Sequence, residues 1–204
     1  MENITFEDRE FYKDELSNLL LAEKIVLNRI EEHRKLIYKK NNGIDYIEHY
    51  KSRIKSAKSI KDKLKKRNLP VNLESALNIL NDAVGIRIIC KFIDDVYSVY
   101  KWIENDDFFT VINVKDYIKN PKSNGYRSLH IIVAVNINDN RSINVEIQIR
   151  TIALDCWASL EHQMKYKKNI KNQKLIEKEL KRCADEIAST DLSMQTLREV
   201  ILEN

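Results

Sequence analysis

Hydrophobic residues recur every three or four positions along most of the chain, which is the spacing of helices that bury one face. This pattern predicts one long helix from Phe6 to Tyr38, closed by the Asn41-Asn42-Gly43 segment. A second helix is expected over about Ile44 to Arg67, and a short one over Ser75 to Asn81. From Ile152 onward the helical spacing continues to the end of the sequence.

The central part of the chain has a different pattern, with runs of branched residues and alternating polarity. Four strands are expected there, over Ile86–Phe92, Thr110–Asp116, Leu129–Asn136 and Asn144–Arg150, and a helix is expected over Asp94–Glu104. The polar turn between the last two strands predicts an antiparallel hairpin. The expected fold is therefore α+β: a mixed, partly antiparallel sheet of about five strands, flanked by helices and by long terminal helices.

Composition narrows the class of protein. Hydrophobic residues make up 43% of the 204 residues and charged residues 32%, as in a globular chain with long solvated helices. Three widely spaced cysteines without a CxxC pair argue against a disulfide framework or a zinc site and fit a reducing compartment. No segment approaches the roughly 20 apolar residues that span a bilayer. We therefore expect a soluble, cytoplasmic protein without a membrane partner.

Positive charge is concentrated in one segment between positions 53 and 67. Its basic residues are Arg53, Lys55, Lys58, Lys61, Lys63, Lys65, Lys66 and Arg67, opposed only by Asp62. On the expected helix, Lys55, Ser59, Lys63 and Lys66 would share one stripe, and a polyphosphate would offset their mutual repulsion. The alternative is a solvated surface helix, which would contact RNA without sequence specificity.

The strand at 145–150 alternates strictly, so Glu146, Gln148 and Arg150 would share one face. Arg87, on the strand at 86–92, would extend this polar face. Asp82 stands at the entrance of that strand, and Mg²⁺ prefers one or two protein carboxylates together with phosphate oxygens and water. Asp82 and Glu146 are therefore candidate magnesium ligands. The alternative is a half-exposed sheet whose polar side faces water, with Asp82 as a cap.

The loop at 115–130 carries an aromatic residue close to cations, namely Tyr126 with Lys122, Arg127 and His130. A ring beside cations suits a nucleotide, because the ring stacks on a base and the cations meet phosphates. An ordinary turn with a structural histidine is the alternative. On the following helix, Asp155 shares a stripe with Ser159, His162 and Tyr166, and its carboxylate suits a guanine edge.

Taken together, five ordered segments resemble the synthetase domain of the RelA/SpoT-homologue family, whose members make guanosine tetra- and pentaphosphate alarmones. The segments are RIKSAKSIKDK at 53–63, DAVGIRI at 82–88, KDYIKNPKSNGYRSLH at 115–130, VEIQIRT at 145–151 and LDCWASLEHQMKYK at 154–167. The resemblance implies a nucleotidyltransferase-like synthetase domain over 44–168. An N-terminal helical segment over 1–43 and a C-terminal oligomerisation helix over 169–204 would flank it. The size implies a stand-alone small alarmone synthetase without hydrolase activity.

The resemblance also implies roles for individual residues on the ATP side. Arg53 and Arg87 would sandwich the adenine. Phosphates would be held by Lys55, Lys63 and Lys66, with Ser59 close by. Lys66 is the least secure of these assignments, because relatives often have arginine there and Arg67 is adjacent. Asp82 and Glu146 would bind Mg²⁺, and Glu146 would serve as base toward the acceptor hydroxyl.

On the acceptor side, Tyr126 would stack on guanine, and Asp155 matches a position that recognises the guanine side. Four further residues would contact the acceptor phosphates or order the site: Lys122, His130, Gln148 and Arg150. The implied reaction, part of stringent-response signalling, moves pyrophosphate from ATP to the 3′-hydroxyl of GDP, GTP or GMP and releases AMP.

Two rival functions remain. One is a nucleotidyltransferase that transfers a nucleotide instead of pyrophosphate, and the other is an RNA-binding module with a degenerate site. The apolar stripe of the last helix either packs on its own domain or, as in small members of the family, forms a homotetramer. Binding of a regulatory alarmone or of single-stranded RNA is left open.

Overall fold

The computed structural model describes residues 4–138, 140–165 and 172–203. Five strands form one sheet in the order β1-β2-β5-β4-β3. Their bounds are β1 Ile47–Ile54, β2 Val84–Cys90, β3 Phe109–Asp116, β4 Leu129–Asn138 and β5 Arg141–Thr151. The β2–β5 pair is parallel and the other three pairs are antiparallel. The predicted mixed sheet and the β4–β5 hairpin are therefore confirmed.

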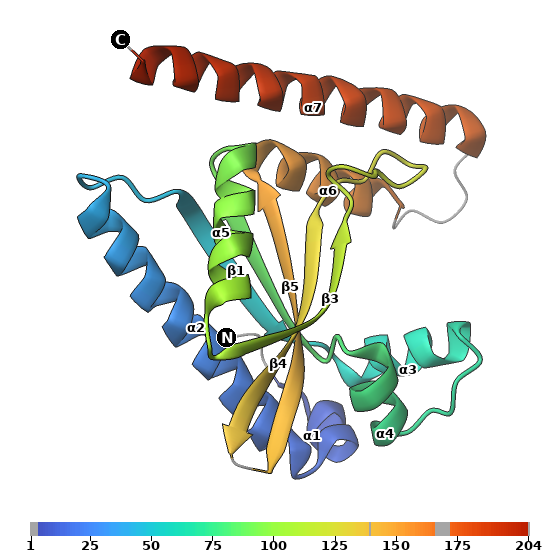
Figure 1. Ribbon diagram of the computed structural model, residues 1–204. Coiled ribbons are helices and arrows are strands. Elements are labelled where there is room, and N and C mark those ends of the chain that lie inside the picture. Colours follow the sequence, from blue (N-terminus) through green and yellow to red (C-terminus); the bar gives the residue numbers. More distant parts are fainter. Residues whose placement is uncertain (1–3, 139, 166–171, 204) are drawn as a thin grey trace.

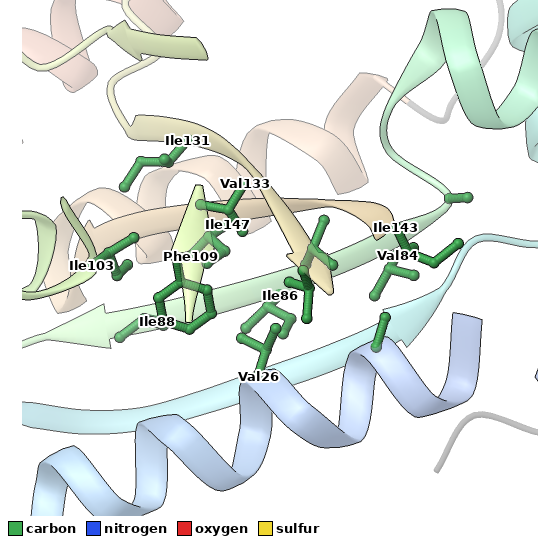
Figure 2. Close-up of a cluster of buried hydrophobic side chains, with 14 of the residues drawn as sticks. Val26, Val84, Ile86, Ile88, Ile103, Phe109, Ile131, Val133, Ile143 and Ile147 are labelled. Atoms are coloured by element: carbon green, nitrogen blue, oxygen red, sulfur yellow. The ribbon is translucent and has the colours of Figure 1, made fainter. Parts of the chain in front are cut away.

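Two helices cover the apolar face of the sheet, α2 (Glu15–Lys40) and α5 (Ile93–Asn105) (Figure 1). The core lies in this layer because every second residue of β2, β4 and β5 is a buried aliphatic one. Figure 2 shows Val26 of α2 pointing at the sheet, beneath Ile86 and Ile88 of β2. The opposite face of the same strands is left to polar residues.

The helix expected over Ile44 to Arg67 is wrong in its first half, which forms the edge strand β1 before α3 (Ala57–Lys66) begins. Ile47, Tyr50 and Ile54 follow one another at intervals of three and four residues, which imitates a helix. A bulge in the pairing with β2 between Ile47 and His49 produces the three-residue interval, because an extra residue shifts the alternation, and the polar Ser52 between Tyr50 and Ile54 leaves the four-residue one. Lys55 consequently lies before α3 and not on a helical stripe with Lys63.

Two other expected helices are interrupted. The first breaks at Lys13 (φ 49°), which separates α1 (Phe6–Tyr12) from α2. The short helix combines α4 (Leu73–Ser75) with the π-helical turn η1 (Ala76–Leu80). Asn81, in the left-handed region with φ 57°, ends it and turns the chain toward Asp82.

At its end, the described chain contains α6 (Ile152–Lys165) and α7 (Gln173–Leu202), which are separate helices. Positions Tyr166 and Lys167 of the predicted stripe and motif, Asp139 of the hairpin turn and the proposed boundary at 168/169 lie outside the described residues. Figure 1 shows α7 running across one end of the molecule, over α5 and α6. Within the described chain, no helix combines the length and hydropathy needed to cross a membrane.

One face of α7 packs on its own domain. The Trp157 indole donates to the Leu180 carbonyl (3.0 Å), and Thr151 donates to the buried carboxylate of Asp191. Farther along, Arg198 pairs with both Asp94 and Asp95 at the start of α5. Apolar side chains on the rest of α7 are exposed: Leu192, Met194, Leu197, Val200, Ile201 and Leu202. The helix thus has both an intramolecular contact and an exposed apolar surface.

Candidate active site

Polar side chains of four strands line up on the face of the sheet opposite α2 and α5. In the strand register, Arg53 lies opposite Gly85, which lies opposite Glu146, while Arg87 lies opposite Gln148, which lies opposite His130. Because residues in register project from the same face, this order brings together side chains that are distant in sequence. A pocket over this face is lined by Lys51, Ser52, Arg53, Lys55, Asp82, Gly85, Ile86, Arg87, Glu146 and Gln148.

Asp82 lies between two basic side chains. Its side chain is 7% exposed, and its Oδ2 atom contacts the ammonium groups of both Lys55 and Lys63. Its Oδ1 atom is buried and has no hydrogen-bond partner among the described residues. A buried carboxylate oxygen without a protein partner is costly, so Oδ1 of Asp82 is a candidate ligand atom for a cation.

Glu146 is held ionised. Burial alone would raise its pKa, but hydrogen bonds from His130 and Gln148 and the charge of Lys63 outweigh burial and lower the pKa to about 2. The contacts are His130 Nδ1 to Oε1 (3.3 Å) and Gln148 Nε2 to Oε2 (2.9 Å). An acid with so low a pKa is a good cation ligand and a weak proton acceptor. This favours the predicted metal role of Glu146 over its predicted role as base.

The two carboxylates fit a magnesium ion. Both line the same pocket, and both interact with Lys63, which contacts Asp82 and helps to lower the pKa of Glu146. Their oxygens are the hard ligands that Mg²⁺ prefers, and the Oδ1 atom of Asp82 accepts no hydrogen bond from any described residue. No cluster of three or more His, Cys, Asp or Glu side chains suited to a metal occurs in the described parts of the chain. Such a cluster is not needed, because Mg²⁺ usually takes one or two protein carboxylates and completes its shell with phosphate and water.

Arg53 and Arg87 are diagonal neighbours on β1 and β2, since Arg87 pairs with Lys51 and Arg53 pairs with Gly85. Diagonal neighbours on one sheet face lie about 7 Å apart, a spacing that admits a planar ring between two guanidinium groups. The Nε atom of Arg87 is buried and has no hydrogen-bond partner in the part of the chain that the structure describes. Burial and the nearby charge of Arg150 lower the pKa of Arg87, so this cation is only partly compensated within the protein.

A hydrogen-bonded network runs along the other half of the site. Arg150, 4% exposed, donates to Asp155 Oδ1 (2.9 Å), to the Tyr126 hydroxyl (2.6 Å) and to Gln148 Oε1 (3.1 Å). The Tyr126 hydroxyl also bonds His130 Nε2 (2.8 Å), whose other ring nitrogen contacts Glu146. Arg87 reaches the same Asp155 oxygen at 3.2 Å. The network therefore joins Asp155, Tyr126 and Glu146.

Arg150 makes these contacts within the protein and is nearly inaccessible, so it orders the site and is shielded from a ligand. Lys122 has the opposite character: it is exposed, and its ammonium group lies over the rings of Tyr117 (4.5 Å) and Tyr126 (4.8 Å). Ser59 and Lys66 lie on exposed positions of α3 and do not line the pocket formed by the described residues.

The sequence interpretation missed three residues of this region. Lys51 and Ser52 line the pocket, but the helix expected at their position gave no reason to place them beside β2. Tyr117 contacts the Tyr126 and His130 rings edge-on, with centroids 6.2 and 5.2 Å apart. Tyr117 belongs to the predicted loop motif, but its contacts could not be predicted because they form only when β4 brings His130 beside the loop.

Known proteins are similar to this chain in sequence and fold. A family described as "Region found in RelA / SpoT proteins" matches residues 52–171. Over 185 residues the chain is 40% identical to the GTP pyrophosphokinase YwaC of Bacillus subtilis (strain 168), with 88% of each chain covered. Over 170 residues it is 30% identical to the GTP pyrophosphokinase YjbM of the same strain, with 82% of this chain and 79% of YjbM covered.

Two solved structures from Bacillus subtilis extend the comparison. Small alarmone synthetase 1, bound to its product pppGpp, matches with a TM-score of 0.79 at 27% identity, covering 93% of this chain and 100% of that one. Small alarmone synthetase 2 matches with a TM-score of 0.75 at 37% identity, covering 92% and 99%. The chain therefore belongs to the RelA/SpoT family, and its length and fold match those of the small alarmone synthetases.

Proposed function

We propose that this protein is a (p)ppGpp synthetase, which transfers the β,γ-pyrophosphate of ATP to the 3′-hydroxyl of GDP, GTP or GMP and releases AMP. One observation carries the proposal: Asp82 and Glu146 line the same pocket as Lys55, Arg53 and Arg87. Two carboxylates among several cations suit a metal-bound polyphosphate, whereas either charge type alone would suit a simpler ligand. Relatives at 40% and 30% identity are named GTP pyrophosphokinases.

ATP binds over β1 and β2. The adenine ring lies between the guanidinium groups of Arg53 and Arg87, where cation–π contact adds to the stacking. The ammonium groups of Lys55 and Lys63, which contact Asp82 in the free protein, turn to the phosphates. Lys66, on α3, meets the far end of the triphosphate, with Ser59 close by.

The guanosine nucleotide binds over β4 and the loop before it. Its base stacks on Tyr126, and Lys122 leaves the ring to meet the acceptor phosphates. Asp155 accepts from the guanine edge through Oδ2, because both of its ion pairs use Oδ1. His130, Gln148 and Arg150 hold Tyr126 and Glu146 in place through the network.

In the reaction, the 3′-hydroxyl oxygen attacks the β-phosphorus of ATP. The bond from the β-phosphorus to the α,β-bridging oxygen breaks, AMP leaves with that oxygen, and the hydroxyl proton passes to water, because Glu146 is a weak proton acceptor. Negative charge grows on phosphate oxygens, which the cations of Lys55 and Lys63 stabilise. Alignment of two nucleotides on one sheet face supplies the entropic part of the acceleration.

Asp82 and Glu146 would hold Mg²⁺. When bound, the ion neutralises phosphate charge and polarises the phosphoryl group that is transferred. Two features support this: Glu146 is kept ionised, and one oxygen of Asp82 has no hydrogen-bond partner among the described residues.

Product identification tests the proposal. The protein is incubated with Mg²⁺, ATP labelled at the β-phosphorus and each guanosine nucleotide in turn, and every product is separated. We expect AMP and a guanosine nucleotide that carries the label as a 3′-pyrophosphate. Release of inorganic pyrophosphate with transfer of AMP would instead identify a nucleotidyltransferase, and no turnover with any acceptor would remove the catalytic assignment.

We also infer a homotetramer assembled through the terminal helices, in the cytoplasm where ATP and guanosine nucleotides are abundant. The exposed apolar side chains of α7 support this assembly, because several exposed Leu, Met, Val and Ile side chains close together on one helix are costly in water. Light scattering at micromolar concentration should give four times the mass of the chain. A monomeric mass would contradict the assembly but not the activity.

A further inference from the structure

Lys55 is fixed at three points. Its amide donates to the Ala83 carbonyl at 2.8 Å, and its ammonium group contacts Asp82. Its own carbonyl accepts a hydrogen bond of 2.5 Å from the hydroxyl of Tyr12, which lies 43 residues earlier on α1. The first two contacts come from the segment that opens β2, but the third comes from a helix outside the family-matching region of residues 52–171.

Tyr12 is well suited to hold a backbone oxygen. It is fully buried, and both its burial and the nearby carboxylates of Asp8 and Asp82 raise its pKa, so the hydroxyl stays protonated and donates. The Lys55 carbonyl would have to find another donor in a dry environment if the hydroxyl were removed.

Asp8, also on α1, makes a second contact just after Lys55. Its Oδ1 atom accepts from the Ala57 amide at 2.7 Å, while Oδ2 accepts from the amide and hydroxyl of Thr5. Asp8 is 8% exposed. Tyr12 and Asp8 thus hold both sides of Ser56, where the chain turns from β1 into α3.

We propose that Tyr12 and Asp8 are positioning residues for ATP: α1 fixes the Lys55–Ala57 backbone so that the Lys55 ammonium group meets the triphosphate beside Asp82. The inference rests on the proposed function for the identity of the ligand. Within the described chain, the contacts of α1 with the site are to the ATP half, since the acceptor network of Tyr126, His130 and Asp155 is built from the loop before β4, from β4 and β5, and from α6. The expected effect is therefore confined to ATP.

The test compares Tyr12→Phe with the wild type in steady-state kinetics, varying ATP and the guanosine nucleotide separately. Loss of one buried hydrogen bond should raise the KM for ATP about three- to tenfold and leave the KM for the acceptor unchanged. Tyr50→Phe is the matched control, because it removes a hydroxyl that bonds Glu31 at 2.7 Å from the same edge strand, outside the pocket. Asp8→Asn weakens the contact to Ala57 and should shift the KM for ATP in the same direction by about two- to threefold.

Affinity for a non-hydrolysable α,β-methylene analogue of ATP, measured by calorimetry on folded protein, separates the two claims. If the wild type makes no 3′-pyrophosphate product but Tyr12→Phe still weakens analogue binding, the proposed function fails and the positioning role stands. Equal changes in both KM values, or unchanged ATP parameters in Tyr12→Phe and Asp8→Asn, would overturn the positioning role. If Tyr12→Phe does not fold, Asp8→Asn alone decides between these outcomes.

Discussion

The Nη2 atom of Arg150 lies 2.6 Å from the phenolic oxygen of Tyr126, so a buried guanidinium group fixes the ring that is proposed to receive guanine. The same arginine holds Asp155, the residue proposed to read the base edge. Stacking platform and base-reading carboxylate are therefore oriented by one side chain, which explains why Arg150 is nearly inaccessible although it is charged.

Removal of the Tyr126 ring should weaken acceptor binding. Tyr126→Ala loses base stacking, which is worth about 1–3 kcal/mol, so the KM for the acceptor should rise about 5- to 150-fold while the KM for ATP stays near its wild-type value. Tyr126→Phe keeps the ring and loses the bonds to Arg150 and His130, so its effect should be smaller. An acceptor KM that does not change in Tyr126→Ala would contradict the stacking role.

The contrast between two lysines of α3 tests the phosphate contacts. Lys63 contacts Asp82, whereas Lys66 lies at the exposed end of the helix. Lys63→Met should lower kcat/KM for ATP about a hundredfold, the scale of losing one fixed electrostatic group. Lys66→Met, the matched control, should lower it by only a few fold. Equal losses in the two variants would show that the cations act through general attraction and not through a fixed contact.

Most strands could be located from the sequence, but of their pairing only the β4–β5 hairpin could be predicted. Alternation identified the positions of β2, β3, β4 and β5, and it put Glu146, Gln148 and Arg150 on one face as observed. The edge strand β1 was misread because a bulge gives its apolar residues helical spacing, and this error removed Lys51 and Ser52 from the candidate site. Pairing between strands that are distant in sequence is a tertiary property, which local periodicity does not contain.

Some features of the site have no local signal. The sequence indicated that Asp82 and Glu146 could meet, but not that Lys55 and Lys63 would neutralise Asp82 or that α1 would hold the Lys55 backbone. Nor did the spacing indicate that Arg150 would be buried by its own partners. These contacts follow from the packing of α1 and α6 against the sheet, and packing depends on the whole fold.

The loop that carries Tyr126 also packs against α7. Gly125 has φ +88°, and a Cβ atom there would meet the Cβ of Ala184 at 2.6 Å. Gly125→Ala should therefore lower the free energy of unfolding by at least about 1 kcal/mol and raise the KM for the acceptor. Gly43→Ala shares the backbone penalty (φ +87°) but meets only ordinary contacts, so it should leave the acceptor KM unchanged. Thermal unfolding and kinetics of both variants check this, and an acceptor KM equal to the wild type in Gly125→Ala would contradict it.

Acid should lower the free energy of unfolding through His33, a buried residue of α2. Its ring stacks on Trp102 with centroids 4.1 Å apart, and burial lowers its pKa from 6.5 to about 4. Unfolded His33 takes up a proton near pH 6.5, but folded His33 stays neutral until about pH 4. Above pH 6.5 the histidine is neutral in both states and costs no stability. As the pH falls from 6.5 to about 4, about 3 kcal/mol of the free energy of unfolding is lost.

Urea unfolding between pH 4 and pH 7 measures this dependence. The His33→Gln variant should show a shallower loss of stability toward acid than the wild type, because no proton is taken up on unfolding at that position. His49→Gln, which alters an exposed histidine, should keep the wild-type slope. If His33→Gln also kept the wild-type slope, the lowered pKa of His33 would be wrong.

The initial rate of AMP release, measured with saturating ATP and acceptor over a range of Mg²⁺ concentrations, tests the joint role of Asp82 and Glu146 most directly. The account predicts that Asp82→Asn and Glu146→Gln each lower the maximal rate at least about a hundredfold, because each removes a charge that holds the ion. A folded variant of either residue that retains a near-wild-type rate and Mg²⁺ dependence would contradict the account.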